Sequence, residues 1–287
     1  MFVYFLILIS LIGSGLAGYI DLKTTEIPDE IPLLMVVFGV GVKILQFIYT
    51  WDIGILIDSI FVGGFYFAFG FAMYYTGQWG GGDAKVLAVV GFLLPSLPSF
   101  INPGLMFPFY VSFLVNFFTL GAVYIIIYTF VYVIRNPELS GKFVSNLKGS
   151  KKEISLFGVF IILITILPTV YLKFYLGLPI DIFMYLLPSG IGLFLLWKFL
   201  KTVENEGFRR KINVEDLEEG DMIGEDIKKG DFELKKKLIR GLTKEEVKKI
   251  REIKNKIWIR EGVRFAPVFP IAILFTLFFG DIIAILI

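Results

Sequence analysis

The sequence contains neither cysteine nor histidine. Without them there can be no thiol nucleophile, no disulfide, no serine–histidine relay and no histidine-based zinc site. The catalytic chemistry that remains is that of paired carboxylates, a Ser–Lys pair or an oxygen-ligated metal. The Ser–Lys option is weak, because the lysines lie in polar loops and in a polar insertion, and none stands in mid-span beside a serine.

Charged residues are also scarce, at 19% of the chain, whereas 56% of the residues are hydrophobic. Several uncharged stretches reach about 20 residues, the length that a helix needs to cross roughly 30 Å of hydrocarbon. The pattern predicts an all-α polytopic membrane protein with about eight (six to eight) transmembrane helices. The candidate spans are residues 2–20, 31–50, 55–76, 84–98, 106–134, 154–176, 180–200 and 265–287. No Lys or Arg precedes the first span, so we expect it to be retained rather than cleaved as a signal peptide.

The distribution of basic residues predicts the topology. With residue 1 outside and eight spans, nearly all lysines and arginines fall on the inside face, in agreement with the positive-inside rule. Segment 84–98 is short for a full crossing. If it does not cross, the later spans invert and the basic loop at residues 135–152 lies outside, which the charge pattern disfavours.

Residues 201–264 interrupt the apolar pattern and predict a small soluble α/β domain on the cytoplasmic side. Thr243 and Glu246 form a capping box that should open a helix reaching about Lys254. The alternation of apolar residues in Lys256–Arg260 predicts a short strand. The predicted organisation is therefore a transmembrane catalytic bundle at 1–200, the soluble domain at 201–264 and a C-terminal transmembrane helix at 265–287.

Two aspartates border apolar runs on the same predicted side of the membrane. Asp21 ends the first run, and Asp83 follows the glycine turn Gly80-Gly81-Gly82, with two spans between them that lead out and back. Ionisable groups at spans are costly and usually serve a function. Two close carboxyls cannot both ionise cheaply, so such a pair shares one proton, as in an aspartic protease. The glycines suit this role, since a turn without Cβ atoms allows close approach of a substrate backbone and positive φ angles.

These residues carry a specific resemblance. Gly80-Gly81-Gly82-Asp83 resembles the GxGD signature of membrane aspartic peptidases, and the segment from Asp21 through Lys23 to Ile27-Pro28 resembles that of type IV prepilin peptidases. The chain looks most like the archaeal branch of preflagellin and prepilin-like signal peptidases, since it lacks a cysteine-rich N-terminal region. The resemblance covers roughly the first 130 residues and is strong only at the two Asp segments.

The resemblance implies that Asp21 and Asp83 are the catalytic pair, with Gly80, Gly81, Gly82, Lys23 and Lys85 as motif residues. The implied reaction is removal of a short basic leader at the cytoplasmic membrane face, without a metal or other cofactor. The implied partners are flagellin-like or pilin-like precursors with class III signal peptides and membrane lipid, with no nucleic acid. For Lys85 itself, contact with lipid phosphate is favoured over tuning of the acid pair.

Other interpretations remain open. An ion- or proton-coupled transporter could use the same aspartates, but it favours acids near the bilayer midplane and symmetric halves, and the sequence shows no inverted repeat. A presenilin-type protease pairs GxGD with Tyr-Asp and Pro-Ala-Leu segments. Here Asp21 follows Ile20, and no Pro-Ala-Leu occurs. A membrane-embedded assembly subunit without activity is a third alternative.

Overall fold

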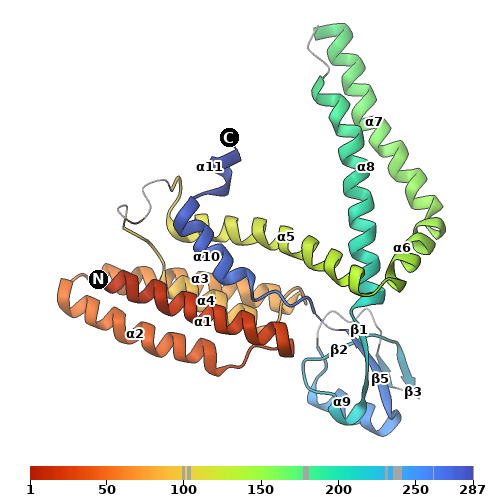
Figure 1. The fold of residues 1–287 in the computed structure, drawn as a ribbon. Coiled ribbons are helices and arrows are strands. Elements are labelled where there is room, and N and C mark those ends of the chain that lie inside the picture. Colours follow the sequence, from red (N-terminus) through yellow and green to blue (C-terminus); the bar gives the residue numbers. More distant parts are fainter. Residues whose placement is uncertain are drawn as a thin grey trace. The chain divides into compact units, whose positions relative to one another are not determined.

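The computed structural model describes residues 1–98, 101, 105–176, 181–229, 232–234, 241–260 and 262–286, and the chain in these ranges is mainly helical. It divides into two compact units, one of residues Met1–Ile125 and Arg210–Ile287 and the other of Ile126–Arg209 (Figure 1). The three predicted domains are not tested by this division and stay predictions.

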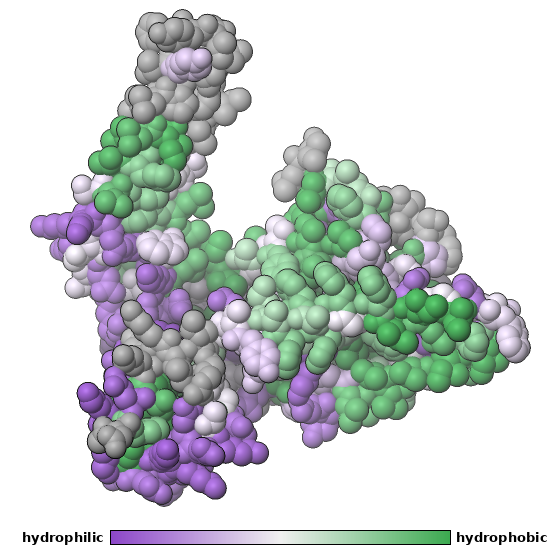
Figure 2. Space-filling model, turned by 180° about the vertical axis from the view of Figure 1, so that it is seen from behind, coloured by the Kyte–Doolittle hydropathy of each residue, from purple (hydrophilic) through white to green (hydrophobic). Residues whose placement is uncertain are grey.

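Four long apolar helices of the described chain are able to cross a membrane by length and composition. They are α1 (Phe2–Thr24), α2 (Glu30–Thr50), α3 (Gly54–Tyr75) and α5 (Phe109–Arg135). Each corresponds to a predicted span. Many of their large apolar side chains are exposed, and Figure 2 shows extended hydrophobic surface of the kind that lipid covers. These features are those of an integral membrane protein. The predicted total of eight spans is not confirmed.

Helix α4 (Gly81–Leu93) is shorter than the predicted segment 84–98. Its 13 residues extend about 20 Å, less than the hydrocarbon thickness, so α4 alone is too short to cross. Most of its side chains are buried, and it belongs to the main apolar core together with residues of α1, α3, α5 and the C-terminal helix. Helix α4 is thus an inner helix enclosed by longer ones.

The second unit contains helices α6 (Glu138–Gly149), α7 (Lys151–Leu176) and α8 (Asp181–Thr202), followed by a π-helical turn η1 (Val203–Gly207). The prediction of a basic loop at 135–152 was wrong in its local structure, because α6 occupies most of it. Helix α6 is polar, with only Leu139 buried, and so lacks the apolar run that identified the other helices. The predicted spans 154–176 and 180–200 lie largely within α7 and α8, except for residue 180, which is outside the described residues. Their crossing of the membrane stays a prediction.

The polar insertion contains a small sheet of strands β1 (Arg209–Asn213), β5 (Lys256–Arg260) and β2 (Met222–Ile223), in the order β1-β5-β2. Strands β3 (Ile227–Lys229) and β4 (Phe232–Leu234) form an antiparallel pair, and Val214–Asp216 form a 3-10 turn, η2. The predicted capping box is confirmed at helix α9 (Lys244–Ile253), and the predicted strand Lys256–Arg260 is confirmed as β5. The insertion has its own apolar core, so an α/β character is confirmed for this part of the chain.

The C-terminal apolar run forms two helices, α10 (Val268–Phe279) and α11 (Ile282–Leu286), rather than the single predicted helix 265–287. Gly280 interrupts the run with a φ of 77°, a conformation that glycine adopts without steric cost. Buried Asn116 of α5 stabilises the break, since it donates to the Gly280 carbonyl at 2.7 Å and accepts from the Ile282 amide at 2.9 Å. The sequence pattern did not reveal this polar connection.

Candidate active site

Asp21 lies in the last turn of α1 and is buried. The helix continues to Thr24, four residues beyond the predicted end of the span. It ends there because Thr25 adopts a left-handed conformation, in which the Thr25 amide donates a hydrogen bond to the Asp21 carbonyl. The Asp21 side chain accepts a hydrogen bond at Oδ2 from the Ala266 amide, at 3.0 Å. The carboxyl is therefore held by a residue 245 positions later in the chain.

Asp83 lies in the first turn of α4 and is half-buried. Its Oδ2 accepts from the Gly80 amide at 3.3 Å, which satisfies one free donor at the helix N-terminus. Its Oδ1 is buried and has no hydrogen-bond partner among the described residues. Such an orphan oxygen inside a membrane protein is costly as a charged group and favours the protonated carboxyl.

The backbone conformation of the glycine turn differs from the prediction of positive φ angles. Gly81 and Gly82 are the first residues of α4, and Gly80 has a φ of −72°, so none of the three uses positive φ. Close approach is required instead at Gly82, where an added Cβ would lie 2.7 Å from the Ile27 Cβ. The Ile27 side chain thus packs directly on the turn that carries Asp83.

The segment after α1 makes a second contact with α4 through an ion pair. Lys85 Nζ lies 2.6 Å from Asp29 Oδ1, and both side chains are exposed. In the structure the charge of Lys85 meets Asp29, and the contact with lipid phosphate that the sequence favoured stays a prediction. Exposed pairs of this kind are worth about 1 kcal/mol or less, so Lys85 is more an aid to loop placement than a catalytic group. Lys23, the other basic motif residue, lies over the Tyr19 ring at 4.3 Å from its centroid.

The two aspartates interact electrostatically. The pKa of Asp83 is raised to about 7, first by burial and second by the negative charge of Asp21, and the hydrogen bond from Gly80 opposes this rise. A carboxyl with such a pKa exchanges a proton near neutral pH, which suits a general acid. The structure thus brings Asp21 and Asp83 into one electrostatically coupled pair, although their catalytic role stays a prediction.

Helix α3 sets the position of α4 through glycine contacts. A Cβ added to Gly70 would lie 2.9 Å from the Ala84 Cα, and one added to Gly63 would lie 2.9 Å from the Phe92 Cβ. From the other side, a Cβ on Gly91 would lie 2.5 Å from the Tyr66 ring. Small residues at these points allow the close backbone approach that is common in membrane helix pairs. Because Ala84 follows Asp83 directly, this packing also fixes the acid.

The sequence reasoning missed the residues that follow the sheet. Arg264 donates a hydrogen bond to the Leu22 carbonyl at 2.6 Å and interacts electrostatically with Asp21. The Ala266 amide donates a hydrogen bond to the Asp21 carboxyl. No motif marks these positions. The one available signal was the arginine immediately before an apolar run, which is also an ordinary feature of a membrane helix end.

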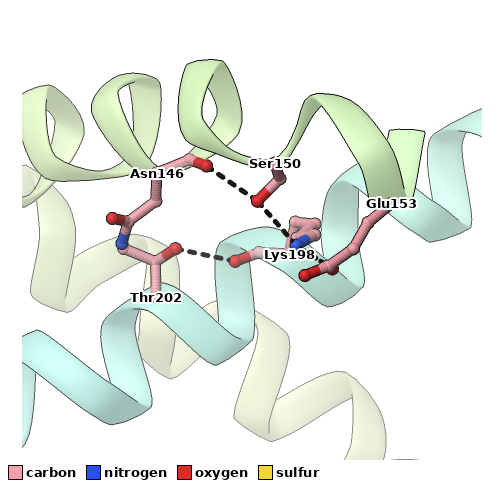
Figure 3. Close-up of polar contacts among 5 residues, drawn as sticks. All are labelled: Asn146, Ser150, Glu153, Lys198 and Thr202. Atoms are coloured by element: carbon pink, nitrogen blue, oxygen red, sulfur yellow. Dashed lines mark hydrogen bonds and ion pairs between the residues drawn. The ribbon is translucent and has the colours of Figure 1, made fainter. Parts of the chain in front are cut away.

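A second polar cluster lies in the other unit, where α6, α7 and α8 line a pocket of about 360 Å³ (Figure 3). Buried Lys198 donates to Ser150 Oγ at 2.9 Å and pairs with Glu153. A Ser–Lys contact therefore exists that the sequence reasoning did not find. However, the Lys198 ammonium is engaged by the Glu153 carboxylate in an ion pair as well as by Ser150, so the contact is accounted for as a polar link between α7 and α8. The arrangement supports a structural role.

The described residues contain no group of three or more Asp and Glu side chains placed to hold a metal ion. The expectation of a metal-free and cofactor-free reaction stays a prediction. The groups that the structure does supply at Asp21 and Asp83 are carboxyls and backbone amides, which suffice for proton transfer to and from a bound water.

Long apolar helices that carry a coupled pair of carboxyls are features of a membrane-embedded enzyme, and comparison with known proteins gives its class. Residues 3–134, which include both aspartates, match the model of the type IV leader peptidase family. The chain is 31% identical over 160 residues to the preflagellin peptidase of Methanococcus maripaludis, covering 52% of this chain and 68% of that protein. It belongs to the type IV leader peptidase family and is a protease.

A second relative covers almost the whole chain. The prepilin peptidase EppA of Methanothermobacter thermautotrophicus is 24% identical over 377 aligned positions, with 98% of this chain and 95% of that protein included. The similarity therefore extends through the sheet-bearing insertion to the C-terminal helices. No solved structure matches the chain.

Proposed function

We propose that this protease removes the short basic leader from pilin-like or flagellin-like precursors, at the cytoplasmic face of the membrane, with water activated between Asp21 and Asp83. The observation that carries the proposal is the electrostatic coupling of these two acids at the ends of helices within the region that matches the family. The names of both relatives support the class of substrate. Helices α2 and α3 lead out and back between the aspartates, which supports their location on one face.

The proposed mechanism uses one proton on the pair. Ionised Asp21 takes a proton from water as the water oxygen attacks the scissile carbonyl, and protonated Asp83 donates to the oxygen that becomes negative. Collapse of the tetrahedral intermediate breaks the C–N bond, and the proton now on Asp21 passes to the leaving amine. As the product carboxyl forms, one hydroxyl of the intermediate returns its proton to Asp83, which restores the pair. The orphan Oδ1 of Asp83 is the natural site of the donated proton, because a neutral carboxyl avoids a buried charge.

The reaction predicts one cleavage site per precursor. Co-expression of the chain with candidate pilin-like and flagellin-like precursors should give a shortened product, and N-terminal sequencing should place the cut between the basic leader and the apolar helix. A precursor whose leader lysines are replaced by glutamine serves as the matched substrate control. Intact precursors in membranes that contain the folded protein would contradict the proposed substrate class.

The pKa of Asp83 predicts the basic side of the pH profile. Since burial and the charge of Asp21 raise this pKa to about 7, Asp83 is mostly protonated below that pH and mostly ionised above it. We expect kcat/KM for cleavage to fall above about pH 7, with a limiting slope of about tenfold per pH unit. The check is initial rates from pH 5 to 9 in detergent or vesicles, with tryptophan fluorescence to exclude unfolding.

The raised pKa of Asp83 also predicts how the stability of the fold depends on pH. A carboxyl whose pKa is higher in the folded state contributes stability that is fully present below the unfolded pKa and is lost as pH rises through the folded value. Thermal stability of the parent should therefore decrease as pH rises toward and through about 7, and Asp83→Asn should lack this component. A flat activity profile from pH 6 to 9 would contradict the proposed role of Asp83 as the acid.

A further inference from the structure

The residues that join the sheet to α10 contact both aspartate-bearing parts of the chain. Strand β5 ends at Arg260 and α10 begins at Val268, and the intervening Arg264–Pro267 segment is described throughout. Ala266 is fully buried within it. This connection is therefore built into the helical core rather than exposed as a simple linker.

On one side the segment holds the end of α1. Ala266 N–H donates to Asp21 Oδ2 at 3.0 Å, and Arg264 Nη1 donates to the Leu22 carbonyl at 2.6 Å. Carbonyls in the last turn of a helix lack partners within the helix, so the arginine satisfies one of them with a charged donor. The backbone also approaches closely here, because a Cβ added to Gly18 would lie 2.9 Å from the Pro267 Cα.

On the other side the segment contacts the turn before Asp83. The Phe265 ring lies 6.1 Å from the Trp79 ring and 5.4 Å from that of Phe117, measured between centroids. Trp79 immediately precedes the glycine turn. The Tyr124 hydroxyl of α5 donates to the Arg264 carbonyl at 2.7 Å, which fixes the backbone of the segment. One short piece of chain thus contacts the surroundings of both acids.

We propose that the Arg264–Pro267 segment is a positioning element of the active site, which orients the Asp21 carboxyl through the Ala266 amide and sets its placement relative to Asp83. The inference rests on the proposed function. The amide occupies Oδ2 of Asp21 and leaves Oδ1 available to take a proton from water. Catalytic groups must be held to within about 0.5 Å of their productive geometry, and a buried backbone donor provides such restraint.

The first test removes the amide donor. Ala266→Pro deletes the N–H at a turn position two residues before α10 begins, and proline is tolerated in turns. Ala266→Gly is the matched control that keeps the N–H. We expect Ala266→Pro to lower kcat by roughly 10- to 100-fold with KM within about threefold of the parent, because a misplaced base slows the chemical step. Ala266→Gly should stay within a few-fold of the parent. Equal kcat values for folded Pro and Gly variants would overturn the proposal.

A second test keeps the proposal falsifiable if Ala266→Pro does not fold. Arg264→Gln should lower kcat by about tenfold, and Arg264→Lys should recover part of the loss because it restores a charged donor. Arg251→Gln is the control, since Arg251 also donates to backbone carbonyls, but within the sheet-bearing part. It should leave kcat unchanged.

The outcomes separate this inference from the proposed function. A parent that cleaves precursor and an Asp21→Asn variant that does not would support the aspartate mechanism whatever the segment does. If in the same assay Arg264→Gln and Arg264→Lys both match the parent in kcat, or alter KM alone, the positioning role is wrong while the protease mechanism stands.

Discussion

Asp21→Asn and Asp83→Asn, each made alone, are expected to lower the rate of leader removal by about 10²–10⁴-fold, the range that a positioned general acid or base contributes. Asparagine keeps the size of the side chain, but it can neither take the proton from water nor donate one as a carboxyl does. Asp21→Asn also keeps an oxygen that can accept from the Ala266 amide. The measurement is the initial rate of precursor cleavage in membranes or vesicles.

Matched acidic residues provide the controls. Asp58→Asn changes an exposed carboxyl of α3, and Asp29→Asn breaks the exposed ion pair with Lys85 without touching either proposed catalytic acid. Both variants should stay within a few-fold of the parent. All four proteins should insert and migrate as the parent does in size-exclusion chromatography. Cleavage by either catalytic variant at the parental rate would exclude the two-aspartate mechanism.

The double variant gives a sharper test of whether the acids act as one unit. Residues that serve the same step are strongly non-additive, so Asp21→Asn combined with Asp83→Asn should be about as slow as the slower single variant. Independent contributions would instead multiply. Multiplicative losses would indicate that the two carboxyls do not share one proton-transfer step.

The most local features were the ones that the sequence predicted best. The spans at α1, α2, α3 and α5 follow from long uncharged runs, and the capping box at Thr243 and the strand at Lys256–Arg260 follow from short-range patterns. The two aspartates were visible because each stands beside an apolar run and one follows three glycines. In these cases the determining interactions lie within a few residues or along one helix.

The features that were missed depend on contacts between distant positions. The break at Gly280 is stabilised by Asn116, and the Asp21 side chain is bonded by Ala266, so neither is encoded in a local pattern. Helix α6 escaped detection because it is polar and resembles a loop in composition. The three glycines were predicted to allow close approach of a substrate backbone, which stays a prediction. The neighbour that lies against Gly82 is Ile27 of the same chain, which only the fold reveals.

Gly70→Val is expected to lower cleavage by about 10²-fold, because a shift of about 1 Å in a catalytic group can cost that much. The valine would place its Cβ 2.9 Å from the Ala84 Cα, a separation that packed atoms do not adopt. Backbone atoms cannot rotate away as a flexible side chain does, so α4 must move away from α3. Asp83, one residue before Ala84, moves with it and loses its placement relative to Asp21.

The same helix offers the control. Gly64 also lies in α3, is exposed, and has nothing within 4 Å of an added Cβ, so Gly64→Val adds the same side chain without displacing α4. It should retain activity within a few-fold of the parent. A smaller change gives a rescue test, since Ala84→Gly removes the Cβ that lies 3.1 Å from the added atom and should restore part of the activity lost in Gly70→Ala. Parental activity in Gly70→Val would mean that α4 can move without effect on cleavage, and the position of Asp83 would then not be set by its packing on α3.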